Sequence, residues 1–185
     1  EADPSMEEVK RVIFAMNGES AAGPNSFTGR FFSFSWEVIG PNVYNAVLSF
    51  FCGVELPRFL TSTSIILIPK GPNPQDFSKF RPISLCIFFN KVLSKILADR
   101  LASLLPSLVS SQQTGFVKGR NITENYLLAQ EIMSGIRKSS RGGNVALKLD
   151  MSKVYHRVSW LFLVNVLRRS GFAERFIDMV WRLIS

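Results

Sequence analysis

The sequence predicts an α+β chain that is mostly helical and carries a small antiparallel sheet. Several long segments place apolar residues at helical spacing. Two short segments rich in β-branched residues are joined by a loop rich in Pro and Gly, which is typical of a β-hairpin. A further short stretch, Val145 to Leu149, alternates apolar and polar residues like a strand with one buried face.

The composition favours a polyanionic partner. Of the 185 residues, 22 are Lys or Arg and 14 are Asp or Glu, a net charge of +8. Nucleic acid, nucleotide phosphates and an anionic membrane surface all fit this charge. A hydrophobic content of 46% is sufficient for one sizeable core. No apolar run approaches the roughly 18 residues of a membrane span, so we expect no membrane-embedded segment.

The compartment is expected to be intracellular and reducing, that is, nucleus or cytoplasm. The acidic N-terminal stretch EADPSMEE is not a signal peptide, and no other targeting signal is evident. Cys52 and Cys86 share no metal-like spacing, and both are expected to be small core residues with reduced thiols.

Helices are predicted for the first part of the chain. A capping box at Ser5 begins the first, over residues 5–16. The aromatic-rich segment 27–39 is expected to be a second helix that ends at Gly40, and Pro41 then begins a third. Aromatic residues at this spacing are core residues far more often than platforms for bases.

A hairpin is predicted next, with strands over Ser64–Ile68 and Phe80–Leu85. Its arms carry Lys70 and Arg81, which would bring two cations together on an exposed element. Such a pair can clamp a triphosphate, and the alternative is two solvated surface cations.

The second half of the chain alternates helices with basic loops. Helices are predicted over 88–105 and 121–135, separated by a loop with glycines beside a cation, which allows close approach to a phosphate. A basic connector at 137–143 leads to the predicted strand. Asp150 then stands at the strand end, where a carboxylate can bind Mg²⁺, although Asp at this position more often caps a helix. Two further helices are predicted, over 160–169 and 173–184. The first of them is apolar nearly all round and is therefore expected to be buried.

Five blocks of this sequence resemble, in order, those of reverse transcriptases of LINE-type (non-LTR) retrotransposons, particularly plant ones. The blocks are Gly23-Pro24 with Phe27, Ile68-Pro69-Lys70, Phe80-Arg81-Pro82-Ile83-Ser84-Leu85, Gln113 to Arg120, and Leu147 to Val158. The resemblance implies the fingers and a partial palm of a right-hand polymerase. Residues 1–62 would form the N-terminal helical part of the fingers, 63–142 the fingers with the basic hairpin and long helices, and 143–185 the incomplete first part of the palm.

The resemblance also implies site residues, cofactors and partners. Asp150 matches a catalytic carboxylate that holds Mg²⁺ in a two-metal site, with the carbonyl of Met151 as a second ligand. Lys70 and Arg81 match residues that hold the phosphates of the incoming dNTP. Tyr155 matches the aromatic residue under the nucleotide sugar, and its alternative role is a core aromatic. The expected partners are an RNA template and a DNA primer, with template or phosphate contacts from Lys91, Lys95, Gln113, Phe116, Gly119 and Arg120.

Departures from the family pattern indicate an inactive fragment. The Tyr/Phe-Ala-Asp-Asp motif with the other two catalytic carboxylates is absent, so we expect the rest of the polymerase polypeptide to be missing. Val154 and His156 stand where Ala and Asp are usual. These changes suggest a decaying transposon copy. A non-catalytic nucleic-acid-binding remnant and a helical protein–protein module are the alternatives.

The decay hypothesis can be tested by restoration. A chain continued through the missing Asp pair and carrying Val154→Ala and His156→Asp should extend a primer on an RNA template faster than the same continued chain without the two substitutions. Equal rates in a primer-extension assay would contradict the hypothesis.

Overall fold

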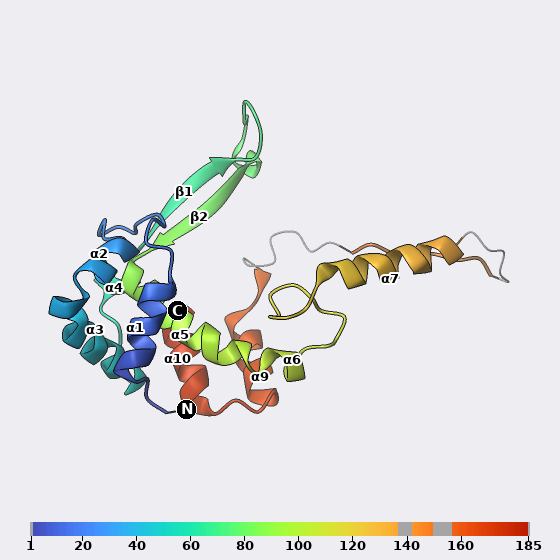
Figure 1. Cartoon of the computed structure of the whole chain (residues 1–185). Coiled ribbons are helices and arrows are strands. Elements are labelled where there is room, and N and C mark those ends of the chain that lie inside the picture. Colours follow the sequence, from blue (N-terminus) through green and yellow to red (C-terminus); the bar gives the residue numbers. More distant parts are fainter. Residues whose placement is uncertain (1, 137–141, 150–156, 185) are drawn as a thin grey trace. The chain divides into compact units, whose positions relative to one another are not determined.

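A computed structural model describes residues 2–136, 142–149 and 157–184 (Figure 1). The predicted fold class is confirmed, because the described chain is mostly helical and its one sheet is a two-stranded antiparallel hairpin. The elements are α1 (Met6–Ala15), α2 (Gly29–Phe34), α3 (Trp36–Phe51), α4 (Arg58–Thr61), β1 (Thr63–Pro69), η1 (Phe77–Lys79), β2 (Phe80–Cys86), α5 (Phe88–Ala102), α6 (Leu105–Leu108), α7 (Ile122–Gly135), α9 (Trp160–Arg169) and α10 (Glu174–Ile184).

The chain divides into two compact units. The first unit comprises residues 1–99 and 171–185, and the second unit comprises residues 100–170. These limits differ from the predicted boundaries at 62 and 142. The predicted division into fingers and palm is a division by function, and it stays a prediction.

The hydrophobic core lies in the first unit. The buried apolar side chains of this unit come from α1, α2, α3, α5 and α10, and include Val9, Ile13, Val47, Phe50, Phe88, Val92, Leu93, Ile96 and Met179. The rings of Phe32 and Phe88, whose centroids are 4.7 Å apart, join α2 to α5. The expectation that the aromatic residues of segment 27–39 are core holds for Phe32 and Trp36, whereas Phe34 is 90% exposed.

The predicted capping residues begin their helices. Ser5 accepts a hydrogen bond from the backbone N–H of Glu8 at 3.1 Å, and Asn121 accepts one from that of Thr123 at 3.0 Å. Each bond satisfies one of the backbone donors that a helix leaves unpaired in its first turn.

The predicted helix boundary at Gly40 and Pro41 is wrong. Helix α3 runs through both residues, and the break lies instead at Ser35. A Cβ atom on Gly40 would lie 3.0 Å from Cε2 of the Trp36 indole, so the glycine allows Trp36 to pack against its own helix. Pro41 removes one backbone donor from the helix, which nevertheless continues to Phe51.

Helix α10 is joined to the end of α3 by two arginines. Arg182 donates to the carbonyl oxygens of Phe50 at 2.8 Å and Val54 at 3.1 Å, and its guanidinium lies 4.4 Å from the centroid of the Phe50 ring. Arg175 donates to the carbonyl of Phe51 at 3.1 Å. The last carbonyls of a helix have no partner within it, so cations at this end stabilise α3.

Two predictions for the second unit are wrong. Residues 145–149 form no strand, and Leu149 is 89% exposed. A strand requires a neighbour for its backbone groups, and within the described residues only β1 and β2 pair. Helix α9 begins after Ser159 as predicted but contains no buried residue. Its apolar composition alone therefore did not establish burial.

The turn at 21–27 packs against the junction of β2 and α5. A Cβ atom on Gly23 would lie 2.5 Å from the carbonyl carbon and oxygen of Cys86. Beside it, the ammonium of Lys91 donates to the carbonyl of Ala21 at 2.8 Å. A glycine is thus required at 23 by close approach of two backbone segments.

Substituting Gly23 by Ala should lower the free energy of unfolding by about 1–3 kcal/mol, because the backbone of Cys86 cannot move away as a flexible side chain would. Denaturant titration followed by circular dichroism measures this. Gly71→Ala is the matched control, since a Cβ atom there meets no atom within 4 Å, and it should leave stability unchanged or slightly raised. Equal stability of the two variants would contradict the packing argument.

Candidate nucleic-acid interface

Some of the predicted site residues are described by the structure and others are not. The hairpin cations, the lysines of α5 and the loop from Gln113 to Arg120 are described. Asp150, Met151 and Tyr155 lie outside the described residues, so their predicted roles stay predictions.

The hairpin brings three cations together at the end of its ladder. Ile68 pairs with Arg81, and the N–H of Lys70 donates to the carbonyl of Lys79 at 2.8 Å, which extends the pairing by one rung. Opposed residues in a sheet share a face, as do residues two apart on one strand. Arg81 therefore belongs to the face that carries Ile66, Ile68 and Ile83, and Lys70 and Lys79 lie just beyond the ends of the two strands, joined by this backbone bond.

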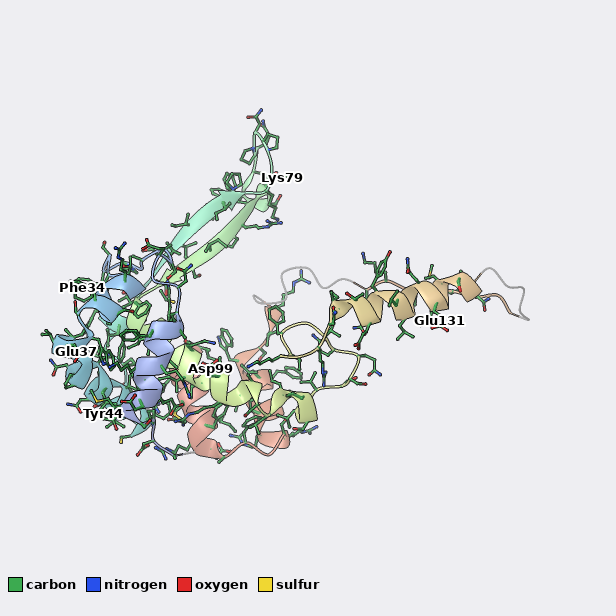
Figure 2. The ribbon with its side chains drawn as sticks, in the orientation of Figure 1. Phe34, Glu37, Tyr44, Lys79, Asp99 and Glu131 are labelled. Carbon is green, nitrogen blue, oxygen red and sulfur yellow. The ribbon has the colours of Figure 1, made fainter. Side chains whose placement is uncertain are left out.

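Lys79 is the cation that sequence analysis missed. Figure 2 shows it near the far end of the hairpin, away from the helices of the first unit. Its position nine residues after Lys70 carries no signal until the register of the hairpin is known. The side chain of Arg81 is exposed and, within the described residues, makes no hydrogen bond or ion pair that would compete with a ligand.

The end of the hairpin is held by Lys70 and Asp76. The ammonium of Lys70 donates to the carbonyl of Ser78 at 2.8 Å, which leaves two of its three donors for a phosphate. Asp76 caps the short helix η1 by accepting from the N–H of Ser78 at 2.7 Å. The hydroxyl and N–H of Ser78, with smaller effects from Lys79 and Lys70, lower the pKa of the Asp76 carboxyl. Asp76 thus balances one charge of a predominantly cationic end.

The two lysines predicted to contact the template have partners inside the chain. Lys95 forms an ion pair with Asp99 at 2.6 Å, one turn further along α5. Lys91 donates to the carbonyl of Ala21. Both ammonium groups thus form polar contacts within the chain at its surface, and their contact with a template stays a prediction.

The loop between α6 and α7 is organised around Arg120. Its Nη1 donates to the carbonyls of Ser110 and Gln113, and its Nη2 donates to those of Pro106 and Val109, at distances of 2.5–3.0 Å. Four backbone oxygens that lie 7 to 14 residues back in the sequence are thereby gathered around one guanidinium.

The remaining predicted residues of this loop shape its backbone. Gly119 has φ +85° and Phe116 has φ +64°, both in the left-handed region. The side-chain amide of Gln113 donates to the carbonyl of Gly115 at 3.2 Å. Phe116 is fully exposed, whereas its neighbour Val117 is buried. The sequence indicates these residues, but it does not distinguish those that hold the loop from those that the loop exposes.

No metal centre is evident in the described residues. Among them, no three side chains of His, Cys, Asp or Glu lie close enough together to hold one ion. The two ligands that the sequence suggested, Asp150 and the carbonyl of Met151, are not described.

The net charge of the chain belongs to one unit. The second unit contains 11 Lys and Arg against 3 Asp and Glu, a net charge of +8. The first unit contains 11 of each sign, a net charge of zero. A polyanion is therefore attracted to the second unit in particular.

The chain belongs to the reverse transcriptase (RNA-dependent DNA polymerase) family. Residues 68–184, well over half of the sequence, match this family. The predicted family is thereby confirmed. The match includes the hairpin from Ile68 onward, the Arg120 loop and helices α9 and α10.

Similar proteins come from mobile elements. The "Transposon TX1 uncharacterized 149 kDa protein" of Xenopus laevis is 27% identical over 94% of this chain and 13% of its own length. The "Retrovirus-related Pol polyprotein from type-1 retrotransposable element R2" of Nasonia vitripennis is 26% identical over 89% of this chain and 15% of its own. The corresponding type-2 R2DM polyprotein of Drosophila melanogaster is 29% identical over 87% and 15%. The chain thus spans about one seventh of these relatives.

In the described parts of the chain, no helix combines the length and apolarity needed to cross a bilayer.

The Asp76 interaction predicts a pH dependence confined to the end of the hairpin. Because the folded pKa lies below the ordinary value of 3.8, the interaction is fully present above that value and is lost as the pH falls through the folded pKa. Nuclear magnetic resonance should show the Ser78 amide titrating below pH 3.8. Ser78→Ala should move the Asp76 pKa back up, and Asp76→Asn should abolish the titration. A midpoint at or above 3.8 in the unsubstituted chain would contradict this arrangement.

Proposed function

We propose that this chain is part of an RNA-directed DNA polymerase of a non-LTR retrotransposable element, which adds dNTPs to a primer 3′-hydroxyl on an RNA template. The observation that carries the proposal is the family match over residues 68–184, with the five sequence blocks in family order. The concentration of positive charge in the second unit supports nucleic acid as the partner.

The hairpin is the part that we assign to the incoming nucleotide. Arg81 offers a planar fork of donors that suits two phosphate oxygens, and Lys79 and Lys70 add point charges at the same end of the hairpin. A triphosphate spans several ångströms, so a row of three cations neutralises it better than a single pair. The face of the hairpin that carries Arg81 also exposes Ile66, Ile68 and Ile83. The cations therefore form the polar end of an otherwise apolar ribbon.

The catalytic roles rest on the resemblance. Asp150 would provide one carboxylate and Met151 one carbonyl to Mg²⁺, which when bound neutralises charge that develops on the transferred phosphate. Tyr155 would lie beneath the sugar of the nucleotide. One carboxylate does not hold two divalent ions, so this chain by itself is expected to be inactive.

The second unit is assigned to the template. Its charge attracts the phosphate backbone, and the loop from Gln113 to Arg120 supplies a shaped surface within it. Lys91 and Lys95 lie on α5 before the second unit begins and would contact the same strand only after exchanging their internal partners. Cys52 is exposed and Cys86 is half-buried, so neither is the core residue that the sequence predicted, and the expected compartment, nucleus or cytoplasm, stays a proposal.

A non-catalytic nucleic-acid-binding remnant is the second candidate. Val154 and His156 favour it, because both depart from the family pattern beside the catalytic Asp150. The remnant would retain the charge of the second unit and lose only the chemistry.

Binding and catalysis can be tested separately. The 185-residue chain should bind an RNA–DNA primer–template with an affinity that falls steeply with salt, and should show no primer extension with dNTPs and Mg²⁺. Arg168→Gln with Arg169→Gln, a basic pair in the second unit, should weaken binding and reduce the slope of log K against log salt by about one to two. Fluorescence anisotropy over a salt series measures both.

The matched control removes the same charge from the first unit. Lys10→Gln with Arg11→Gln, a basic pair in α1, should leave the affinity and its slope close to those of the unsubstituted chain. Equal effects of the two pairs would contradict the assignment of the template to the second unit. Absence of binding at low salt would overturn the proposed function. The enzyme and the remnant are distinguished by Asp150→Asn in a polymerase chain that continues beyond residue 185. The enzyme loses primer extension on this change and keeps binding.

A further inference from the structure

We propose that Phe116 is a stacking platform for an unpaired base of single-stranded nucleic acid, and that Arg120 and Asn125 are positioning residues that hold the loop presenting it. The proposal rests on the proposed function in one respect only, namely that the second unit binds nucleic acid. It assigns to Arg120 a different task from the phosphate contact that its charge suggests.

The guanidinium of Arg120 is already occupied. It carries five N–H donors, and the four on Nη1 and Nη2 point to the carbonyls of Pro106, Val109, Ser110 and Gln113. Binding a phosphate through two parallel hydrogen bonds would require at least one of these carbonyl bonds to break. The geometry therefore makes Arg120 the centre of the loop and not its contact surface.

A second side chain, from the helix that follows the loop, holds the loop by hydrogen bonds. Asn125, in the first turns of α7, donates through Nδ2 to the carbonyl of Gln112 at 2.6 Å and to Oγ1 of Thr114 at 3.3 Å. On the other side of Phe116, Val117 is buried. The backbone is thus fixed on both sides of an aromatic residue that is itself fully exposed.

Phe116 contributes nothing to the fold that contains it. Its side chain is fully exposed, and its φ of +64° is a conformation that costs free energy for a bulky residue. A glycine would adopt the same backbone without strain. An exposed aromatic residue in a strained position, held by two dedicated polar side chains, is explained by a partner outside the chain.

The charge around Phe116 selects that partner. Lys118, two residues further along, is exposed and has no hydrogen bond or ion pair within the described residues. The whole unit has a net charge of +8. An exposed aromatic ring close in sequence to a free cation, within a basic unit, suits single strands, because the ring stacks on a base while cations bind the phosphates. An apolar protein surface would gain nothing from these charges.

The test compares bases with backbone. Binding of the 185-residue chain to a fluorescent oligoadenylate RNA is measured by anisotropy, beside binding to an abasic ribose-phosphate strand of equal length. Phe116→Ala should weaken binding to oligoadenylate by about 5- to 150-fold, the loss expected for one stacked base, and should leave binding to the abasic strand unchanged. Phe116→Trp should restore the affinity. Phe34→Ala, at a similarly exposed Phe in the first unit, whose net charge is zero, is the control and should change neither.

The roles of the two loop cations are separated by salt dependence. Lys118→Gln should reduce the slope of log K against log salt for oligoadenylate by about 0.7, the value for one phosphate contact on a single strand. Arg120→Gln removes the same charge but should weaken binding with the slope unchanged, and should add no further loss to Phe116→Ala. Asn125→Ala should behave as Arg120→Gln does, which keeps the positioning role testable should the Arg120 variant unfold.

The outcomes distinguish the two levels of the proposal. If the unsubstituted chain binds oligoadenylate and Phe116→Ala binds it equally well, the stacking platform is overturned while the proposed function stands. If the unsubstituted chain binds neither strand at low salt, the proposed function itself fails. A slope reduced by Arg120→Gln as much as by Lys118→Gln would overturn the positioning role. Phe116→Gly should melt no lower than the unsubstituted chain, which shows that the phenylalanine is not there for stability.

Discussion

The first unit depends on the contact between Arg182 and the end of α3. The Phe50 carbonyl at the end of helix α3 accepts from the backbone N–H of Gly53, and Arg182 adds a charged donor to it while it covers the Phe50 ring and bonds the carbonyl of Val54. This contact brings residues 171–185 back to the first 99. The 100–170 segment is therefore an insertion whose two ends are anchored in one compact unit. The unit that contains the hydrophobic core has no net charge, and the insertion has a net charge of +8. Residues that stabilise the fold are thus largely separate from those that attract a polyanion.

Local chemistry made much of the fold predictable. Helix starts at Ser5, Asn121 and Ser159 and the two hairpin strands follow from residues adjacent in sequence, so the sequence alone predicted them. The errors concern residues whose role depends on a distant or unexpected neighbour. Gly40 is the smallest side chain beside an indole and not a helix end. Alternation at 145–149 likewise predicts a strand only where a neighbouring strand is available.

The candidate site shows the same limit. Lys70 and Arg81 were predicted from their sequence blocks, but Lys79 joins them only through the register of the hairpin. Arg120 was recognised as important because of its type and position. Its charge gave no indication that four carbonyl oxygens surround it, because those oxygens belong to backbone that any sequence possesses. Composition likewise gives the net charge of the chain but not its segregation into one unit.

The prolines of the hairpin have a consequence for self-association. Starting from the bond between the Lys70 N–H and the Lys79 carbonyl, the antiparallel ladder alternates so that Pro69 and Pro82 fall at positions whose nitrogen faces the free edge. Neither proline costs a bond inside the hairpin, and each deletes a donor that a third strand would require. A two-stranded ribbon that exposes isoleucines on both faces is thus made a poorer template for a third strand at either edge.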